Sequence, residues 1–176
     1  MKEKLDKPNS IQTTGDIVDL ILEDHKPLKE LIKILKNDDA DMEDRVMAFE
    51  QFAPLLISHA KPEEESLYNF MKEDDELRVE GMEGETEHEI ADRLINEIYE
   101  TDNKYLWSAK VKVLAELVEH HIKVEEKTFL PDLKKYSTES DRMEIGKQFL
   151  ELKNTLFSEN FEDIDYQEII EEIHMQ

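Results

Sequence analysis

Residues 59–67 read His-Ala-Lys-Pro-Glu-Glu-Glu-Ser-Leu, and residues 121–129 read His-Ile-Lys-Val-Glu-Glu-Lys-Thr-Phe. Both segments fit the pattern H-x-K-x-E-E-x-S/T-L/F, so the chain contains the same motif twice. Each copy places its first Glu four positions after its His, a spacing that puts the two side chains on one face of a helix. The repeat therefore predicts two related helical units.

A second repeated signal, at nearly the same separation, concerns two single histidines. His25 and His88 each follow an acidic residue, and each precedes a Leu-Ile pair six and seven positions later. Each half of the chain thus supplies a lone His on one helix and a His-x-x-x-Glu on the next. Two such hairpins packed together predict an all-α, up-down four-helix bundle with approximate two-fold symmetry.

The spacing of apolar residues gives the expected extents of the helices. Asp16 is a suitable N-cap for the first of them. The predicted helices cover about 16–37, 42–74, 85–102, 104–135 and a shorter 137–157. We expect residues 74–84, which are acidic and contain glycine, to be a connection, and the tail from Ser158 to be a final amphipathic helix or a fraying end. The predicted organisation is a flexible lead-in over 1–13, the bundle over 14–136 and a helical extension of one or two helices over 137–176.

Composition excludes several classes of function. The chain has 22 Lys and Arg against 45 Asp and Glu, a net charge of −23, which argues against nucleic acids and anionic membranes as partners. It has no Cys, which excludes disulfides, thiolate zinc sites and iron–sulfur clusters. No apolar run is long enough to span a bilayer, and the charged N-terminus has no apolar segment behind it. The sequence therefore predicts a cytoplasmic protein.

Two buried glutamates need an explanation. His59 with Glu63, and His121 with Glu125, each lie one helical turn apart on an apolar stripe, so both pairs face the bundle interior. A buried carboxylate is costly unless it is paired or bound to a metal, and no Lys or Arg lies on these stripes. Metal cations in the bundle core would supply the missing positive charge.

The arrangement predicts two metal ions. One would be held by His25, His59 and Glu63, and the other by His88, His121 and Glu125, with the two carboxylates close enough to the symmetry centre to bridge. Four acidic residues adjacent in sequence are candidate partners for the imidazoles: Asp24, Glu64, Glu87 and Glu126.

This ordered set of residues resembles the hemerythrin HHE cation-binding family over roughly residues 16–135. The family motif has one His on the first helix, His-x-x-x-Glu on the second, His on the third and His-x-x-x-Glu on the fourth. The resemblance implies a non-haem centre of two iron ions with an oxo or hydroxo bridge, able to bind dioxygen or a related small ligand. Its metal residues fall on His25, His59, Glu63, His88, His121 and Glu125. Mixed imidazole and carboxylate sites also accept zinc or manganese.

Two departures from the family shape the expected function. Oxygen-carrying hemerythrins have a further His one turn before the third-helix His, where this chain has Gly84. The resemblance therefore favours binding or reduction of dioxygen, peroxide or nitric oxide over oxygen transport. Relatives that repair iron centres often have an N-terminal segment with Cys, which this chain lacks. The alternative is a non-catalytic iron or oxygen sensor, or an iron-handling module.

Some candidate ligands stay open at this point. His120 competes with His121, although the repeat favours His121, and Glu85 is a possible extra ligand beside His88. Pro62 lies inside the His59–Glu63 pair and removes a helical hydrogen bond. We expect a kink or a local bulge there that leaves the pair intact.

Overall fold

The computed structural model describes residues 14–162, which form helices and no strand. The helical elements are α1 (Ile17–Leu35), α2 (Met42–Glu63), the π-helical turn η1 (Glu64–Tyr68), α3 (Asn69–Glu73), α4 (Arg78–Tyr99), α5 (Lys104–Val124), the π-helical turn η2 (Glu125–Phe129), α6 (Leu130–Tyr136) and α7 (Glu139–Glu162). The predicted lead-in over 1–13 and the last part of the predicted extension, 163–176, lie outside the described residues. None of the helices in the described range is long and apolar enough to cross a bilayer.

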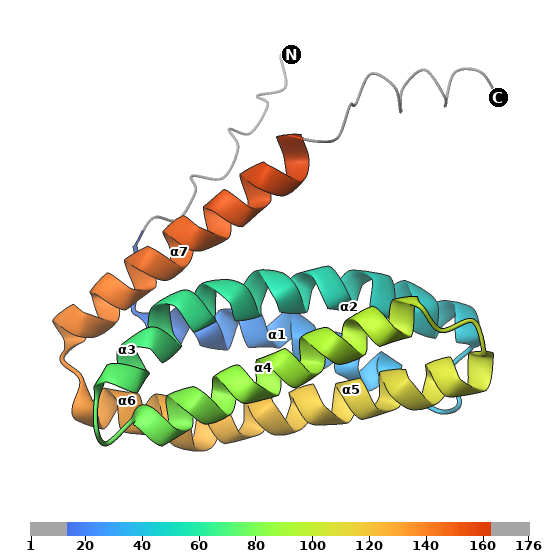
Figure 1. Ribbon diagram of the computed structural model, residues 1–176, viewed down its shortest axis with the longest axis horizontal. Helices are drawn as coiled ribbons and strands as arrows, with labels where there is room; N and C mark the ends of the chain where they lie inside the picture. The colour runs from blue at the N-terminus through green and yellow to red at the C-terminus, as the bar shows by residue number, and fades with distance from the viewer. Residues whose placement is uncertain (1–13, 163–176) are drawn as a thin grey trace, which may run out of the picture.

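Four rods form the bundle (Figure 1). α1 and α4 are single rods, whereas α2, η1 and α3 are continuous, as are α5, η2 and α6. α1 packs against α2 and α5, and α4 packs against α5 and α2, so the rods close into a ring with antiparallel neighbours. The predicted up-down four-helix bundle is therefore confirmed. The predicted N-cap is also correct, since the Asp16 carboxylate accepts a hydrogen bond from the Val18 amide at 2.9 Å.

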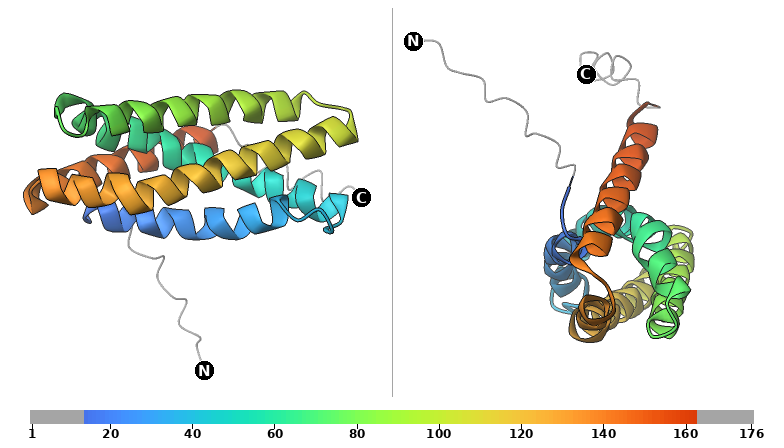
Figure 2. Two further views of the ribbon diagram at one scale, coloured as in Figure 1. Left: turned by 90° about the horizontal axis from the view of Figure 1, so that it is seen from below. Right: turned by 90° about the vertical axis from the view of Figure 1, so that its left-hand side faces the viewer.

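α7 is the additional C-terminal helix, and it crosses α1 and α2 obliquely at one end of the bundle (Figure 2). Gly146 permits the close approach, because a Cβ at this position would lie 1.9 Å from the Gly15 carbonyl oxygen. The helix continues to Glu162, beyond the predicted end at residue 157.

The segment predicted as a connection over 74–84 is mostly helical, since α4 begins at Arg78. The two glycines that suggested a loop serve close packing between helices instead. A Cβ at Gly81 would lie 2.9 Å from the Met71 Cβ, and a Cβ at Gly84 would lie 2.5 Å from the Tyr68 ring. Glycine here removes bulk at a helix contact, which composition alone does not distinguish from a turn.

The interior is divided into two apolar clusters along the bundle axis. One cluster lies toward the α1–α2 and α4–α5 turns and includes Leu28, Ile32, Phe49, Phe52 and Leu114. The other lies toward α7 and includes Ile17, Ile21, Leu67, Phe129 and Leu133. On each of the four rods the metal-ligand candidates fall between residues of these two clusters.

The prolines are accommodated without a break. α1 continues through Pro27, and α2 continues through Pro54 and Pro62. The expected local bulge is present as η1, which starts directly after Glu63, and His59 still faces Glu63 across 3.4 Å. The second motif copy has Val124 in place of Pro62 and also contains a π-helical turn, so proline is not the cause of both bulges. π-Turns often mark functional positions in helices.

Candidate metal centre

The six predicted metal residues lie together in the middle of the bundle. They are His25 from α1, His59 and Glu63 from α2, His88 from α4, His121 from α5 and Glu125 at the start of η2. None is more than 3 % exposed. Four rods thus bring four imidazoles and two carboxylates into a layer closed on both sides by apolar side chains.

Their potential ligand atoms form two groups, each spanning no more than 4.8 Å. One group contains His25, His59 and Glu125, and the other contains Glu63, His88 and His121. The sequence prediction assigned each Glu to the histidines of its own hairpin, whereas the structure exchanges the two glutamates. Each Glu lies four residues, about 6 Å, further along the helix axis than its own His. The position of each rod along its neighbour then decides which histidines the carboxylate lies beside.

Both carboxylates nevertheless remain close to both groups. Glu63 Oε2 lies 3.4 Å from His59 Nε2 and 3.7 Å from His88 Nε2. Glu125 Oε2 lies 3.1 Å from His25 Nε2 and 3.8 Å from His121 Nε2. Each carboxylate therefore lies between a histidine of one group and a histidine of the other, which is the position that a bridging ligand requires.

The outer nitrogens of two histidines make short hydrogen bonds to acidic residues. His25 Nδ1 donates to Glu126 Oε1 at 2.9 Å, and His121 Nδ1 donates to Glu87 Oε2 at 2.7 Å. A proton held on Nδ1 leaves the Nε2 lone pair free, so Nε2 is the atom available to a metal.

The other two histidines also have an acidic side chain beside Nδ1. His88 Nδ1 lies 3.2 Å from Glu64 Oε1, and His59 Nδ1 lies 3.5 Å from Asp24 Oδ2. Each of the four outer carboxylates belongs to a residue next in sequence to a member of the centre on another rod. The sequence had identified these four residues as candidate partners of the imidazoles, and the structure shows which histidine each carboxylate lies beside.

Burial dominates the electrostatics of the centre. It lowers the pKa values of His59 and His88, so these imidazoles stay neutral. Burial, together with the neighbouring Glu125, raises the pKa of Glu63 well above its usual range. Burial also opposes ionisation of Glu125, but the close contact with His25, at 3.1 Å, and the surrounding histidines prevail and lower the pKa of Glu125.

Several buried polar atoms of the centre have no aligned hydrogen-bond partner among the described residues. They are Nε2 of His25, both ring nitrogens of His59, both carboxylate oxygens of Glu63, Nδ1 of His88 and Oε2 of Glu125. Polar atoms buried without a partner are costly. A cation accepts electron pairs from imidazole nitrogen and carboxylate oxygen together, so the donor set fits bound metal ions.

Tyr68 is a member of the site that sequence reasoning missed. Its side chain is fully buried, and its hydroxyl donates to Glu125 Oε1 at 3.1 Å and lies 3.4 Å from His121 Nε2. Burial and the two glutamates raise the pKa of Tyr68 well above its usual range, so the phenol keeps its proton. The available signal was the end of the repeat, where Tyr68 follows Ser-Leu but Leu130 follows Thr-Phe.

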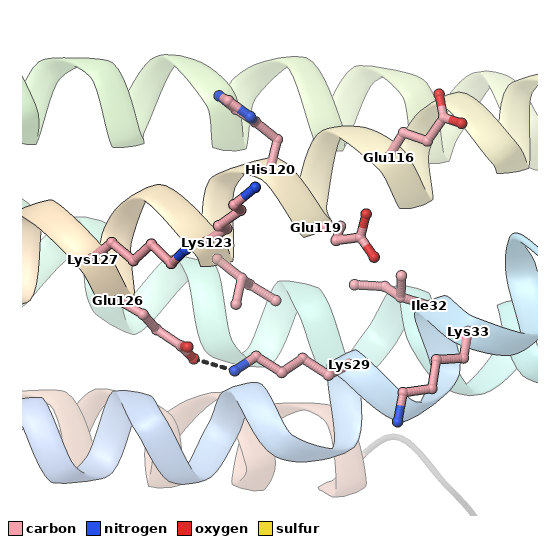
Figure 3. Close-up of a pocket in the computed structure, with 10 residues that line it drawn as sticks. Lys29, Ile32, Lys33, Glu116, Glu119, His120, Lys123, Glu126 and Lys127 are labelled. Atoms are coloured by element: carbon pink, nitrogen blue, oxygen red, sulfur yellow. Dashed lines mark hydrogen bonds and ion pairs between the residues drawn. The ribbon is translucent and has the colours of Figure 1, made fainter.

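The two open candidates do not join either group. His120 is exposed and lines a surface pocket of about 550 Å³ between α1 and α5 (Figure 3). Glu85 pairs with Lys72 at 2.8 Å. The same pocket contains the ion pair between Lys29 and Glu126, so the partner of His25 is reached from the surface there (Figure 3).

A family model described as "Hemerythrin HHE cation binding domain" matches residues 16–133, more than half of the 176-residue chain. The matched range begins at the N-cap of α1 and ends in α6, so it covers all four rods and the six residues of the centre. No curated protein and no solved structure matches the chain.

Proposed function

Since the chain belongs to the hemerythrin HHE cation-binding family, we propose that its buried centre holds two iron ions and binds or reduces dioxygen, peroxide or nitric oxide. One observation carries this proposal: the two groups of three buried donors share two glutamates that each lie within 3.8 Å of a histidine from either group. Two cations, one held by each group of donors, would share these two carboxylates.

Iron is proposed because of the donor chemistry. Imidazole and carboxylate ligands without thiolate suit iron, and such sites also accept zinc and manganese. Iron bound here would supply redox and Lewis-acid chemistry to a small ligand. Three protein donors in each group are fewer than the six that octahedral coordination uses, which leaves positions for that ligand.

The residues of the chain prepare the site for such a ligand. Glu87 and Glu126 hold the protons of His121 and His25 on Nδ1, which aims both Nε2 lone pairs inward. The apolar clusters on both sides keep bulk water from the centre. A ligand that reaches it must be small, because the surrounding side chains are buried.

Metal analysis of matched variants tests the proposal. The wild type and two variants, His59→Ala and His120→Ala, are loaded anaerobically with ferrous iron, desalted and analysed for iron. We expect two irons per chain in the wild type and in His120→Ala, which changes an exposed histidine next to a buried one. His59→Ala should lose at least one iron. Wild-type protein that retains no iron, or a His59→Ala variant that retains both, would overturn the proposal.

A second measurement separates the proposed chemistry from a non-catalytic sensor or iron store. The absorption spectrum of the reduced, loaded wild type is recorded before and after addition of dioxygen, peroxide or nitric oxide. A spectral change that depends on the ligand and is absent in His59→Ala supports ligand chemistry at the centre. Loaded protein with two irons and no response to any of the three ligands would favour the sensor or store.

A further inference from the structure

Tyr68 makes the two halves of the centre chemically unlike. Its hydroxyl points between Glu125 Oε1, at 3.1 Å, and His121 Nε2, at 3.4 Å, and its ring centroid lies 5.3 Å from that of His88. The phenol therefore faces the group formed by Glu63, His88 and His121. In the other hairpin the repeat places Leu130 at the matching position, which offers no donor atom.

The distances around the Tyr68 oxygen are those expected between ligands of one ion. Donor atoms bound at about 2.0–2.2 Å from a metal lie roughly 3–4 Å from one another. The Nε2 atoms of His88 and His121 are 3.1 Å apart, and the Tyr68 oxygen is 3.4 Å from His121 Nε2. The phenol oxygen thus belongs to the same close-packed set of donors.

The backbone opposite Tyr68 is shaped for this ring. A Cβ at Gly84 would lie 2.5 Å from Tyr68 Cζ and 2.7 Å from its hydroxyl oxygen. In the first hairpin the residue equivalent to Gly84 is Ile21, and both Ile21 and Leu130 are buried in the same apolar cluster. The contact between Tyr68 of the first hairpin and Gly84 of the second is therefore replaced, at the symmetry-related positions, by two aliphatic side chains, Leu130 and Ile21.

We propose that Tyr68 is a seventh protein ligand, which binds through its phenol oxygen to the cation held by Glu63, His88 and His121, so that the two metal positions differ in kind. This inference rests on the proposed function. On binding, the O–H bond of Tyr68 breaks and its electron pair forms the bond to the metal. The proton passes to Glu125, which already accepts it, and from there to solvent as the cation neutralises the site.

The experiment uses ferric iron as the probe and compares the wild type with Tyr68→Phe and Tyr105→Phe. Tyr105 is 76 % exposed and lies on α5, so its variant controls for loss of a phenol elsewhere. We expect a visible phenolate-to-iron(III) charge-transfer band, with tyrosine ring modes in resonance Raman spectra, in the wild type and in Tyr105→Phe. Tyr68→Phe keeps the ring packing. It should lose the band and bind the iron held by Glu63, His88 and His121 on the order of tenfold more weakly.

Zinc, which gives no colour, supplies an independent reading. Calorimetric titrations in buffers of different ionisation enthalpy count the protons released on zinc binding. The wild type should release about one more proton than Tyr68→Phe, whereas Tyr105→Phe should match the wild type. The variant Gly84→Ala retains the phenol but displaces it, so it should weaken the iron band.

The outcomes separate this inference from the proposed function. Wild-type protein that binds two irons without the charge-transfer band, or a Tyr68→Phe variant that retains it, would overturn the ligand role of Tyr68 and leave the two-iron proposal standing. Equal proton release by wild type and Tyr68→Phe would also overturn it. Failure of the wild type to bind iron would overturn both.

Discussion

The Nε2 atoms of His88 and His121 face each other across 3.1 Å inside the bundle. Glu87 holds a proton on Nδ1 of His121, and Glu64 lies beside Nδ1 of His88, so both Nε2 atoms present lone pairs to each other. Burial, followed by the neighbouring His121, lowers the pKa of His88 well below its usual range, so His88 itself does not supply a proton to relieve the contact at neutral pH. A metal ion placed between the two nitrogens would accept both lone pairs and so relieve the contact.

Metal loading should therefore stabilise the fold. A metal that binds only the folded chain adds about 4 kcal/mol when its free concentration is a thousand times Kd, which raises Tm by roughly 10 °C for a protein of this size. Thermal unfolding with and without bound iron or zinc measures the effect. His120→Ala should show the same increase, and His59→Ala a smaller one. An unchanged Tm on loading would contradict the expectation.

Replacement of Glu63 should affect the empty and the loaded protein in opposite directions. Burial and Glu125 raise the pKa of Glu63, so its ionised form is unfavourable without a metal. Glu63→Gln should make the metal-free protein more stable by about 1 kcal/mol at pH 8 and should remove at least one bound metal.

Denaturant titrations and metal analysis measure the two effects of Glu63→Gln. Glu65→Gln is the matched control, because Glu65 is exposed on the same rod and its replacement removes the same carboxylate. A Glu63→Gln variant that retains both metals would show that this carboxylate is not a ligand.

The outer carboxylates should tune metal affinity without binding the metal. Glu87 accepts from His121 Nδ1 at 2.7 Å and so fixes the orientation and tautomer of that ring. Glu87→Gln should weaken binding of one metal about 10-fold to 100-fold and leave the saturating stoichiometry at two. Competition titrations with a chelator measure this, with Glu89→Gln, an exposed acid on the same helix, as the control. A loss of stoichiometry would instead make Glu87 a direct ligand.

One pH effect should arise away from the centre, where α4 meets α6. Burial, and then the hydrogen bond with Asp132, raises the pKa of Glu80 from 4.5 to about 7. The folded state therefore binds this proton more tightly than the unfolded state. The resulting stability is complete below pH 4.5 and is lost as the pH rises through about 7.

Glu80→Gln should remove the loss of folding stability that accompanies the rise in pH. The variant should gain stability relative to the wild type as the pH rises from about 5 to about 8, by on the order of 1 kcal/mol after allowance for solvent screening. Denaturant titrations at the two pH values measure the difference. Glu151→Gln, an exposed acid on α7, should show no such trend. A difference that does not vary with pH would refute the assigned pKa shift.

Periodicity and repetition predicted the parts of this structure that depend on helix geometry. A His and a Glu one turn apart on an apolar stripe must both face inward, and His59 with Glu63 do so. The same reasoning placed Asp16 at the N-cap of α1. These relations hold within one helix, so residue spacing alone determines them.

Relations between rods were harder to predict. The exchange of Glu63 and Glu125 between the two groups depends on how far each rod is displaced along its neighbour, which spacing within a helix does not encode. The start of α4 at Arg78 was missed because glycine was interpreted as a turn residue, whereas Gly81 and Gly84 serve close packing. Tyr68 was missed because its contacts with His121 and Glu125 are contacts between rods, which spacing within a helix does not encode.

The fit between Gly84 and Tyr68 restricts how this pair can change by mutation. Any side chain added at 84 collides with the ring while Tyr68 is present, and loss of the ring while Gly84 is present leaves a void beside the histidines. The two positions should therefore change together, and a bulky residue at one should accompany a smaller or aliphatic residue at the other. Among sequences that share this bundle, the residues at positions 68 and 84 alone would distinguish chains with two matched cation positions from chains with two different ones.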